Sequence, residues 1–457
     1  MRLGGPSFWF DEMGGPPALR PALAGDTVAD VAIVGAGYTG LWAAYYLAQA
    51  APSLRIVVVD QQFAGFGASG RNGGWLTGSF AWNPARYAAD RGRPAVLAMA
   101  DALHAGVEEV IRVARAEGIA ADIHRTEELT VATSHAQLTR MMDEVAQRSH
   151  WGEGDRLRVL DAGEIRDRIA IPGALGALAL SGVARIQPAR LVTGLAAAVE
   201  RLGVRIAEGT RVTAIAPGRL ETTHGTLRAT IILRCTEGFS ATLPGARRDW
   251  LPLNSAQIAT APLAEDTWAK IGWQGHEIVG DFAHVYCYCQ RTAGGRLVVG
   301  SRGVPYRFGS ALDDRGRPDP ATIRHLHTIL RRHFPAAADA PVTHAWCGVL
   351  GVPRDWCATV GYDPATGIGH AGGYVGVGVA TSNLAGRVLA DLVLGRDSDL
   401  TRLPLVNRAV TRWEPEPLRW LGLRGMYAAL HLADRMEARP GAGPSWLAAL
   451  AYRLAGR

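Results

Sequence analysis

Three glycines near the amino terminus have the spacing of a turn that binds dinucleotides. Gly35, Gly37 and Gly40 form a Gly-x-Gly-x-x-Gly pattern between a β-branched strand and an Ala/Leu-rich helix. The first glycine makes the bend, the second lets the backbone and the helix N-terminus approach a pyrophosphate, and the third lets the helix pack on the strand. Asp60 ends a second strand, at the distance where a carboxylate accepts hydrogen bonds from ribose hydroxyls. Together these features predict a dinucleotide-binding βαβ unit over about residues 28–62, rather than an ordinary glycine turn.

The dinucleotide fingerprint occurs once, although two other segments are rich in glycine. No second fingerprint follows a predicted strand between residues 150 and 300, where an enzyme that uses two dinucleotides would carry it. The sequence therefore favours one tightly held dinucleotide. Residues 67–74 read Gly-Ala-Ser-Gly-Arg-Asn-Gly-Gly, and residues 372–378 read Gly-Gly-Tyr-Val-Gly-Val-Gly. The second of these segments leads into a predicted helix, and glycine-rich packing without a ligand is its alternative interpretation.

Apolar periodicity predicts a protein in which helices and strands alternate. The expected helices cover residues 94–117, 137–148, 191–202, 321–334 and 379–394, and the last of them ends at Gly395. The expected strands cover residues 128–133, 204–207, 211–215, 230–236, 257–260, 284–289 and 296–300. The strands after residue 250 are expected to be antiparallel, and the turn over 292–295 indicates a hairpin. The strand that ends in Thr236-Glu-Gly238 is expected to rejoin the dinucleotide-binding sheet.

This order of elements predicts an α/β fold, or α+β overall. A doubly wound Rossmann-type dinucleotide-binding domain is expected over residues 26–95, 165–245 and 340–398. A second domain with a mostly antiparallel sheet is expected over residues 96–164 and 246–339. An N-terminal extension, 1–25, holds Phe8-Trp9-Phe10 as an aromatic anchor, and a C-terminal extension, 399–457, holds two basic amphipathic helices at about 415–437 and 445–456. We expect these helices to form a packed cap or a homo-oligomer interface, with attachment to a membrane surface as the alternative.

Composition excludes several classes of protein. The 457 residues are 48% apolar and 20% charged, which is typical of a globular protein with more than one core. The net charge of +6 is spread without a basic run, so no nucleic-acid partner is expected. The five cysteines lack a Cys-x-x-Cys pair, which argues against a zinc ribbon, and no metal site is expected. The uncharged stretch 364–386 is rich in glycine and contains polar residues, so we expect no membrane span and a cytoplasmic protein.

The glycine turn, Asp60 and the two glycine-rich segments resemble the glycine/D-amino-acid oxidase (DAO) family of FAD-dependent oxidoreductases. The run over 67–74 is most similar to the γ-glutamylputrescine oxidoreductase-like branch of that family. The similarity covers most of residues 28–398 in the same order and leaves both extensions outside. It implies that FAD is the cofactor. It also implies non-covalent binding, because Cys347 lies one residue out of register with the cysteine that tethers flavin in sarcosine-oxidase relatives.

The resemblance assigns cofactor contacts to individual residues. Backbone that lies against a flat ring leaves no space for Cβ, so the run from Gly67 is expected along the isoalloxazine ring. The N-terminus of the helix after residue 378 would direct its N–H groups and positive dipole toward the N1–C2=O edge of the flavin. Arg71 and Asn72 would donate to flavin carbonyls, or Arg71 to a phosphate. The expected pyrophosphate contacts are Gly35, Gly37, Tyr38, Thr39 and Gly40; the adenosine contacts are Asp60, Gln61 and Val212; the remaining contacts are Gly67, Ala68, Ser69, Gly73, Gly74, Thr236, Gly238, Gly373, Tyr374, Gly376, Val377 and Gly378.

The family reaction removes a hydride from the carbon that bears an amine and delivers it to flavin N5. The resulting imine then hydrolyses. The implied partners are an amine or amino-acid substrate and O2 or another electron acceptor. Since the flavin performs the difficult step, no catalytic base is required.

Substrate contacts are expected from the antiparallel sheet. His284, Tyr286 and Tyr288 alternate with Val285 and two cysteines, Cys287 and Cys289, so one of the two sets faces inward. We expect His284 and the two tyrosines to face the flavin, and the opposite orientation is the alternative. Arg302, or Arg307 after it, would bind a carboxylate bidentately, although an isolated arginine more often forms an ordinary ion pair. Trp346 is expected in the core.

Three questions stay open from the sequence. Lys270 is the single lysine, so the residue that promotes reaction with oxygen in sarcosine-oxidase relatives is Lys270, is replaced by an arginine, or is absent. Oxidase and dehydrogenase activities are therefore both compatible with the sequence. The alternative functions are a flavoenzyme that tailors a secondary amine or imine intermediate, an RNA-modifying flavoprotein, and a flavin-bound scaffold without turnover.

Overall fold

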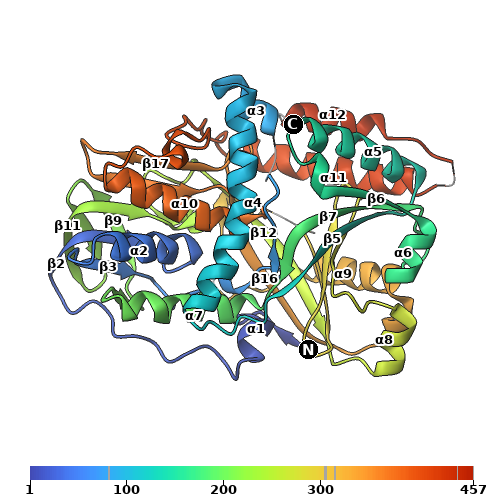
Figure 1. Ribbon diagram of the computed structural model, residues 1–457, viewed down its shortest axis with the longest axis horizontal. Helices are drawn as coiled ribbons and strands as arrows, with labels where there is room; N and C mark the ends of the chain where they lie inside the picture. The colour runs from blue at the N-terminus through green and yellow to red at the C-terminus, as the bar shows by residue number, and fades with distance from the viewer. Residues whose placement is uncertain (81–82, 303–305, 313–314, 440, 456–457) are drawn as a thin grey trace.

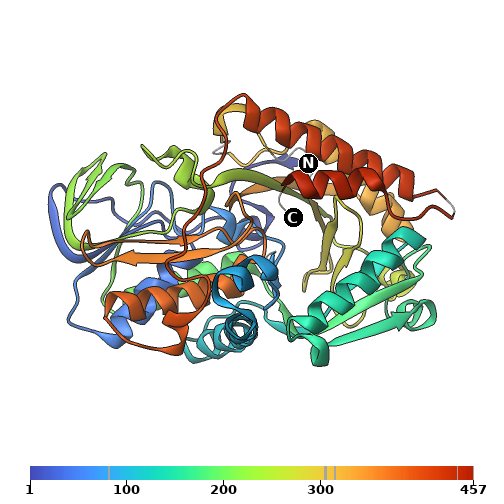
Figure 2. The same cartoon turned by 90° about the horizontal axis from the view of Figure 1, so that it is seen from above.

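Two β-sheets lie side by side in the computed structural model, each with helices packed against it (Figures 1 and 2). The structure describes residues 1–80, 83–302, 306–312, 315–439 and 441–455. The smaller sheet carries the predicted dinucleotide-binding unit, and the larger sheet carries the predicted antiparallel strands. The predicted fold class is confirmed.

The smaller sheet has the strand order β17-β18-β11-β2-β3-β8. Its centre is parallel: β11 (Gly225–Arg234), β2 (Thr27–Val34), β3 (Ile56–Val59) and β8 (Arg205–Ala207). Central parallel strands are buried on both faces, which explains why β3 is wholly apolar. The strand β18 (Ile368–Gly372) continues the parallel pairing beside β11. Antiparallel pairs extend the sheet further through β17 (Thr359–Asp363), which pairs with β18, and through β9 (Val212–Ala216) and β10 (Arg219–Thr222). The prediction that the strand before Thr236 rejoins this sheet is confirmed.

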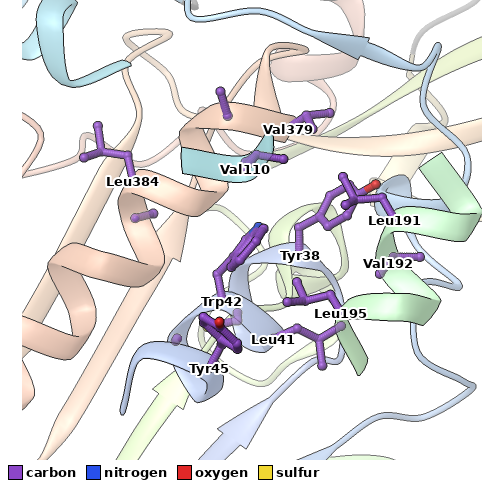
Figure 3. Close-up of a cluster of buried hydrophobic side chains, with 14 of the residues drawn as sticks. Tyr38, Leu41, Trp42, Tyr45, Val110, Leu191, Val192, Leu195, Val379 and Leu384 are labelled. Atoms are coloured by element: carbon purple, nitrogen blue, oxygen red, sulfur yellow. The ribbon is translucent and has the colours of Figure 1, made fainter. Parts of the chain in front are cut away.

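Three helices pack together against the smaller sheet: α2 (Tyr38–Ala50), α7 (Pro188–Arg201) and α10 (Gly378–Val393). Figure 3 shows Tyr38, Leu41 and Trp42 of α2 facing the apolar side chains of α7 and α10. The helix α2 is buried around most of its circumference, which is why its sequence is apolar on nearly every face. This packing fixes where α2 and α10 begin.

The larger sheet has the strand order β1-β16-β12-β15-β14-β13-β5-β7-β4, with β6 paired to β7. Most of its neighbours are antiparallel, as predicted, and the hairpin over 292–295 joins β14 to β15. Two pairs, β1–β16 and β13–β5, are parallel. The strands are β1 (Arg2–Leu3), β4 (Trp75–Leu76), β5 (His124–Ala132), β6 (Leu157–Asp161), β7 (Gly176–Arg185), β12 (Leu251–Thr260), β13 (Ile278–Asp281), β14 (Cys287–Arg291), β15 (Leu297–Ser301) and β16 (Val342–Val352).

Three strands join a different sheet from the one that the expected domain segments imply. The expected dinucleotide-binding segments 26–95, 165–245 and 340–398 contain β4, β7 and β16, which belong to the larger sheet. The reason is hydrogen bonding, because β16 pairs with β12 along its whole length and β7 pairs with β5. The chain therefore crosses between the sheets more often than the pattern indicates.

The remaining helices surround the larger sheet and its border with the smaller one. The long helix α4 stands between the two sheets in Figure 1, and α11 and α12 lie side by side in Figure 2. Among the residues that the structure describes, no helix is long and apolar enough to cross a membrane. The helices are α1 (Phe8–Asp11), α3 (Pro84–Arg91), α4 (Arg93–Ala116), α5 (His135–His150), α6 (Ala162–Arg168), α8 (Glu265–Ile271), α9 (Pro320–His333), α11 (Leu418–Glu437) and α12 (Trp446–Ala455).

Candidate active site

A cavity of about 870 Å³ lies between the two sheets. Its lining comes from almost the whole chain, from Val34 at the end of β2 to Tyr452 in α12. The starts of α2 and α10 form part of it. Strands of the larger sheet, α5 and the two C-terminal helices form the rest. A cavity of this size can hold an extended cofactor and a small substrate together.

The glycine turn before α2 is closed by contacts that exclude side chains. Gly35 has a φ of 105°, and a Cβ there would lie 2.6 Å from the carbonyl oxygen of Cys235. A Cβ at Gly40 would overlap with the carbonyl oxygen of Gly35, so α2 can approach the turn only because residue 40 is glycine. Ser69 Oγ accepts the N–H of Tyr38 at 2.8 Å and joins the turn to the second glycine-rich segment.

Two helix N-termini border the same cavity. The helix α10 begins at Gly378 after a loop in which Val375 and Gly376 both have positive φ. A hydrogen bond of 3.0 Å between Thr39 Oγ1 and the Tyr374 hydroxyl connects this loop to α2. Within the described chain, no side chain caps either helix and neither first turn contains an acid. These positive ends therefore fit a ligand with anionic phosphates and an electron-rich ring edge, as in FAD.

Two carboxylates organise the backbone around the cavity. Asp60 accepts the N–H groups of Ala36 and Gln62, each at 2.8 Å, and burial raises its pKa to about 6. Its side chain therefore braces the glycine turn as well as bordering the cavity. Ribose binding by Asp60 stays a prediction.

Glu237 is a cavity residue that the sequence analysis missed, although it stands between two predicted contacts. Its Oε1 accepts the N–H groups of Gly373 at 2.9 Å and Tyr374 at 3.1 Å, and its Oε2 accepts that of Gly351. Its φ is 45°, and burial raises its pKa to about 7. An acid at the end of a central strand, in a turn otherwise made of small residues, was the available signal. Glu237 holds the loop before α10 to the ends of β11 and β16.

The segment over 67–74 is held by the protein itself. Asn72 Nδ2 donates to the Ser69 carbonyl at 2.8 Å, and its Oδ1 accepts the N–H of Gly74. Arg71 donates through Nε to the Phe66 carbonyl at 2.7 Å and through Nη1 to the Cys347 carbonyl at 3.1 Å. Both side chains border the cavity and these bonds shape the loop, while donation by either side chain to the cofactor stays a prediction.

The N-terminal aromatic anchor supports this segment from behind. Trp9 Nε1 donates to the Asn72 carbonyl at 2.8 Å, and Ser7 Oγ donates to the Gly70 carbonyl at 2.7 Å. A Cβ at Gly70 would lie 2.5 Å from the ring of Phe10. The predicted anchor is thus confirmed, and its role is to fix the loop that borders the cavity.

Four predicted cofactor residues do not line the cavity, and they are Gly40, Gly74, Gly238 and Gly373. At each of these glycines the space that a Cβ would occupy is filled by other atoms of the protein. A Cβ at Gly238 would lie 2.7 Å from Val349, and one at Gly74 would overlap with the Gln290 amide. The structure brings all the other predicted cofactor residues, and all four predicted substrate residues, to the cavity.

Arg302 and two tyrosines form the part of the cavity next to the larger sheet. Arg302 Nη2 donates to the Tyr286 hydroxyl and to the Val375 carbonyl, each at 3.0 Å. Its guanidinium also lies over the ring of Trp356 and beside the hydroxyl of Tyr427. Tyr427 belongs to α11, so this site is completed by the C-terminal extension. No local motif marks Tyr427, and sequence reasoning missed it.

Tyr288 faces the cavity from β14, and its hydroxyl lies 2.8 Å from Ser255 Oγ. Burial raises its pKa well above the ordinary value for tyrosine. Cys287 and Cys289 are buried in the core of the larger sheet, although Cys287 and Val285 also border the cavity, so the expected alternation is only partly met.

His284 does not belong to the strand in which it was predicted. The strand β14 begins at Cys287, and His284 lies in the preceding loop. Its ring bonds to the Tyr452 hydroxyl at 2.8 Å and to Glu437 at 3.0 Å, while Asp434 accepts its backbone N–H. These partners all come from the C-terminal helices, so His284 anchors the extension while also bordering the cavity.

Other candidates lie away from the cavity. Lys270 is exposed on α8, and Arg307 donates to the carbonyl of Arg317. Cys347 is buried beside Asn254, and Trp346 is fully buried, as expected for a core residue. Residues 303–305, which separate Arg302 from Arg307, lie outside the described chain.

A Rossmann-type sheet and an antiparallel sheet that share one cavity, with two helix N-termini directed at it, define a flavin-dependent oxidoreductase. The family model described as FAD dependent oxidoreductase, DAO, matches residues 30–392, and the chain belongs to this family. The protein is therefore an enzyme, and FAD is its cofactor.

Named relatives and solved structures agree with this assignment. The chain is 29% identical over 377 residues to γ-glutamylputrescine oxidoreductase of Escherichia coli K12, a match that covers 80% of this chain and 84% of the relative. It is 29% identical over 410 residues to the probable oxidoreductase OrdL of Rhizobium meliloti, covering 86% and 90% of the two chains. Glycine oxidase from Geobacillus kaustophilus shares the fold with a TM-score of 0.67 and 22% identity, over 84% of this chain and all of the other.

Proposed function

We propose that this enzyme oxidises the carbon–nitrogen bond of an amine or amino acid. The observation that carries the proposal is the position of Arg302 and Tyr286, which border the cavity beside the glycine-rich loop that precedes α10. The name of the E. coli relative, which states an amine as its substrate, supports the same class of reaction. When bound, FAD accepts the hydride at N5, and the protein residues orient the substrate.

Arg302 is proposed to bind the carboxylate of an amino-acid substrate. It is buried, with 5% of its surface exposed, and the aromatic rings around it shield it from water. A carboxylate gains more from a guanidinium in such surroundings than in solvent. The hydroxyls of Tyr286 and Tyr288 lie beside it to orient the amine. The mostly apolar walls favour the neutral form of that amine, which is the form that gives up a hydride.

FAD is proposed to bind without a covalent bond to the protein. The thiol of Cys347 is buried in the core of the larger sheet and is absent from the cavity lining, which supports this expectation. Precipitating the purified enzyme with trichloroacetic acid tests it directly. Yellow colour in the supernatant is the expected result, and yellow colour in the pellet contradicts it.

An anaerobic substrate screen tests the proposed reaction. The yellow holoenzyme is mixed with a panel of amines and with both enantiomers of the amino acids, and absorbance near the flavin maximum is followed. Bleaching by at least one of these compounds is expected. Bleaching by dithionite but by none of them contradicts the proposal.

The same experiment addresses the electron acceptor. Rapid recovery of the flavin spectrum on readmission of air indicates an oxidase, and slow recovery indicates a dehydrogenase with another acceptor. A slow recovery is expected, because the single lysine, Lys270, lies outside the cavity lining. A cytoplasmic location and a homo-oligomer formed through the C-terminal helices stay predictions.

A further inference from the structure

A carboxylate that forms no ion pair with any residue described by the structure faces the substrate side of the cavity. Glu128 and Thr130 line the cavity from β5, whereas Leu129 and Val131 between and beyond them are buried in the core. This alternation is that of a strand with one face toward the cavity. Glu128 therefore presents its side chain to the space in which a substrate would lie.

The surroundings of Glu128 are apolar. Its neighbours across the sheet are Ile278 on β13 and Leu180 on β7, which are fully buried, and Trp75 packs against both. Directly opposed residues share one face of a sheet, so two aliphatic side chains flank the carboxylate. This removal of water raises the pKa of Glu128.

No cation of the described chain neutralises Glu128. The hydroxyl of Thr77 lies beside it, and no ion pair within 4 Å involves it among the described residues. The charge of Arg148 influences the Glu128 carboxyl group from more than 4 Å away. The guanidinium of Arg148 is engaged elsewhere, since it pairs with Glu153 at 2.9 Å and donates to Ser79 at 2.6 Å. A desolvated carboxylate without a cationic partner is costly, so such a group either takes up a proton or binds a ligand that supplies the positive charge.

We propose that Glu128 binds a second cationic group of the substrate, so that the enzyme prefers amines that carry a positive charge remote from the oxidised carbon. This inference rests on the proposed function and specifies its substrate class.

The sheet geometry gives the separation between the two ends of such a substrate. Tyr288 is paired with Gly280, and Gly280 is paired with Thr130, so Thr130 lies two strands from Tyr288 on the cavity face. Two strand spacings amount to about 10 Å. Glu128 is two residues further along β5. A chain of about eight bonds spans this distance, which makes a long α,ω-diamine the simplest probe.

The test compares 1,8-diaminooctane with octylamine, which has the same carbon chain and one amino group. In anaerobic titrations of the holoenzyme, flavin reduction is expected to require about tenfold less diamine than monoamine. Glu128→Gln keeps the shape of the side chain and removes its charge. It is expected to raise the apparent Kd for the diamine by about tenfold or more, and to leave that for octylamine within about twofold. The limiting rate of reduction is expected to stay unchanged, because Glu128 binds and does not react.

Asp143→Asn is the matched control. Asp143 also lines the cavity, from α5, but it is exposed to solvent, so its substitution is expected to change neither apparent Kd. FAD content and the visible spectrum establish that each variant is folded. Equal affinity of the wild type for the two amines, or an equal change for both in Glu128→Gln, overturns the inference.

Failure of the proposed amine oxidation can be distinguished from failure of the proposed cation site. If neither amine reduces the flavin, the same titrations follow perturbation of its visible absorption band by bound amine. A perturbation that is selective for the diamine and is lost in Glu128→Gln supports the cation site while refuting amine oxidation. No selective perturbation overturns the inference.

Discussion

The carboxylate of Asp60 accepts the backbone N–H of Ala36 at 2.8 Å. This bond joins the end of β3 to the middle of the glycine turn that precedes α2. An acid at the end of the second strand is ordinarily interpreted by what it offers the ribose. Here it also holds the shape of the turn, because its second oxygen accepts the N–H of Gln62. The same residue therefore holds the loop, and its contact with the ribose stays a prediction.

Replacing Asp60 by alanine is expected to weaken FAD binding by about 10- to 100-fold. A hydrogen bond to a charged group contributes about 1.5–3 kcal/mol, and the substitution removes such bonds to the turn. The measurement is a fluorescence titration of the apoprotein with FAD. Asp30→Ala is the control, because Asp30 forms an exposed pair with Arg55 near the other end of β2. Equal affinity of Asp60→Ala and wild type would contradict this role.

Gly40→Ala is expected to abolish FAD retention and to lower stability by about 3 kcal/mol or more, since its Cβ would overlap with the Gly35 carbonyl. Gly422→Ala is the matched control. Gly422 is exposed in α11 and a Cβ there meets nothing, so alanine is expected to stabilise the helix by up to about 1 kcal/mol. Urea unfolding and the flavin content of the purified variants measure both effects. A yellow, stable Gly40→Ala would show that α2 can move away from the turn.

Arg302→Lys is expected to raise the KM for an amino-acid substrate by about 10- to 100-fold, because lysine keeps the charge but cannot bind a carboxylate bidentately. For an amine without a carboxylate, the KM is expected to change by less than about threefold. Arg307→Lys is the control, since Arg307 lies outside the cavity lining. The KM values for both types of substrate are measured by steady-state kinetics. An equal increase in KM for both types would refute carboxylate binding by Arg302.

The attachment of the C-terminal helices is expected to weaken in acid. Glu437 pairs with Arg140 at 2.6 Å and with His284 at 3.0 Å, and although burial opposes its ionisation, these partners lower its pKa to about 2. A lowered pKa stabilises the folded state fully above about pH 4.5, and this contribution is lost as the pH falls toward 2.

Glu437→Gln is accordingly expected to cost about 1–2 kcal/mol at pH 7, after allowance for screening near the cavity, and progressively less below pH 4.5. Chemical unfolding at pH 3 and pH 7 measures this difference. Glu414→Gln is the control, because Glu414 forms a more exposed pair with Arg354. A cost for Glu437→Gln that is the same at both pH values would contradict the assignment.

Much of the fold could be predicted because its signals are local. The turn at Gly35 and Gly37, the alternation around Tyr288 and the hairpin over 292–295 depend on neighbours within a few residues. His284 was misplaced for the opposite reason, since Asp434 and Tyr452 hold it from more than 140 residues away. The sheet positions of β7 and β16 depend in the same way on distant partners.

The residues of the candidate site also differ in whether a local signal predicts them. The predicted cofactor residues belong mostly to glycine motifs with a fixed spacing, which is why most of them line the cavity. Glu128 and Tyr427 carry no motif of their own, and the only signal for Glu237 is its place after a predicted strand. The positions of Glu128 and Tyr427 follow only from strand pairing and from the packing of α11, which a single sequence does not reveal.

The hydrogen bond between Thr39 and Tyr374 joins positions 335 residues apart. During synthesis, the ribosome must therefore release more than four-fifths of the polypeptide before these two cofactor-facing ends can meet. Any nascent chain that stops earlier exposes the apolar flank of α2 without the α10 partner that covers it. FAD binds the assembled form and stabilises it. The supply of FAD is therefore expected to limit the yield of mature enzyme after translation is complete.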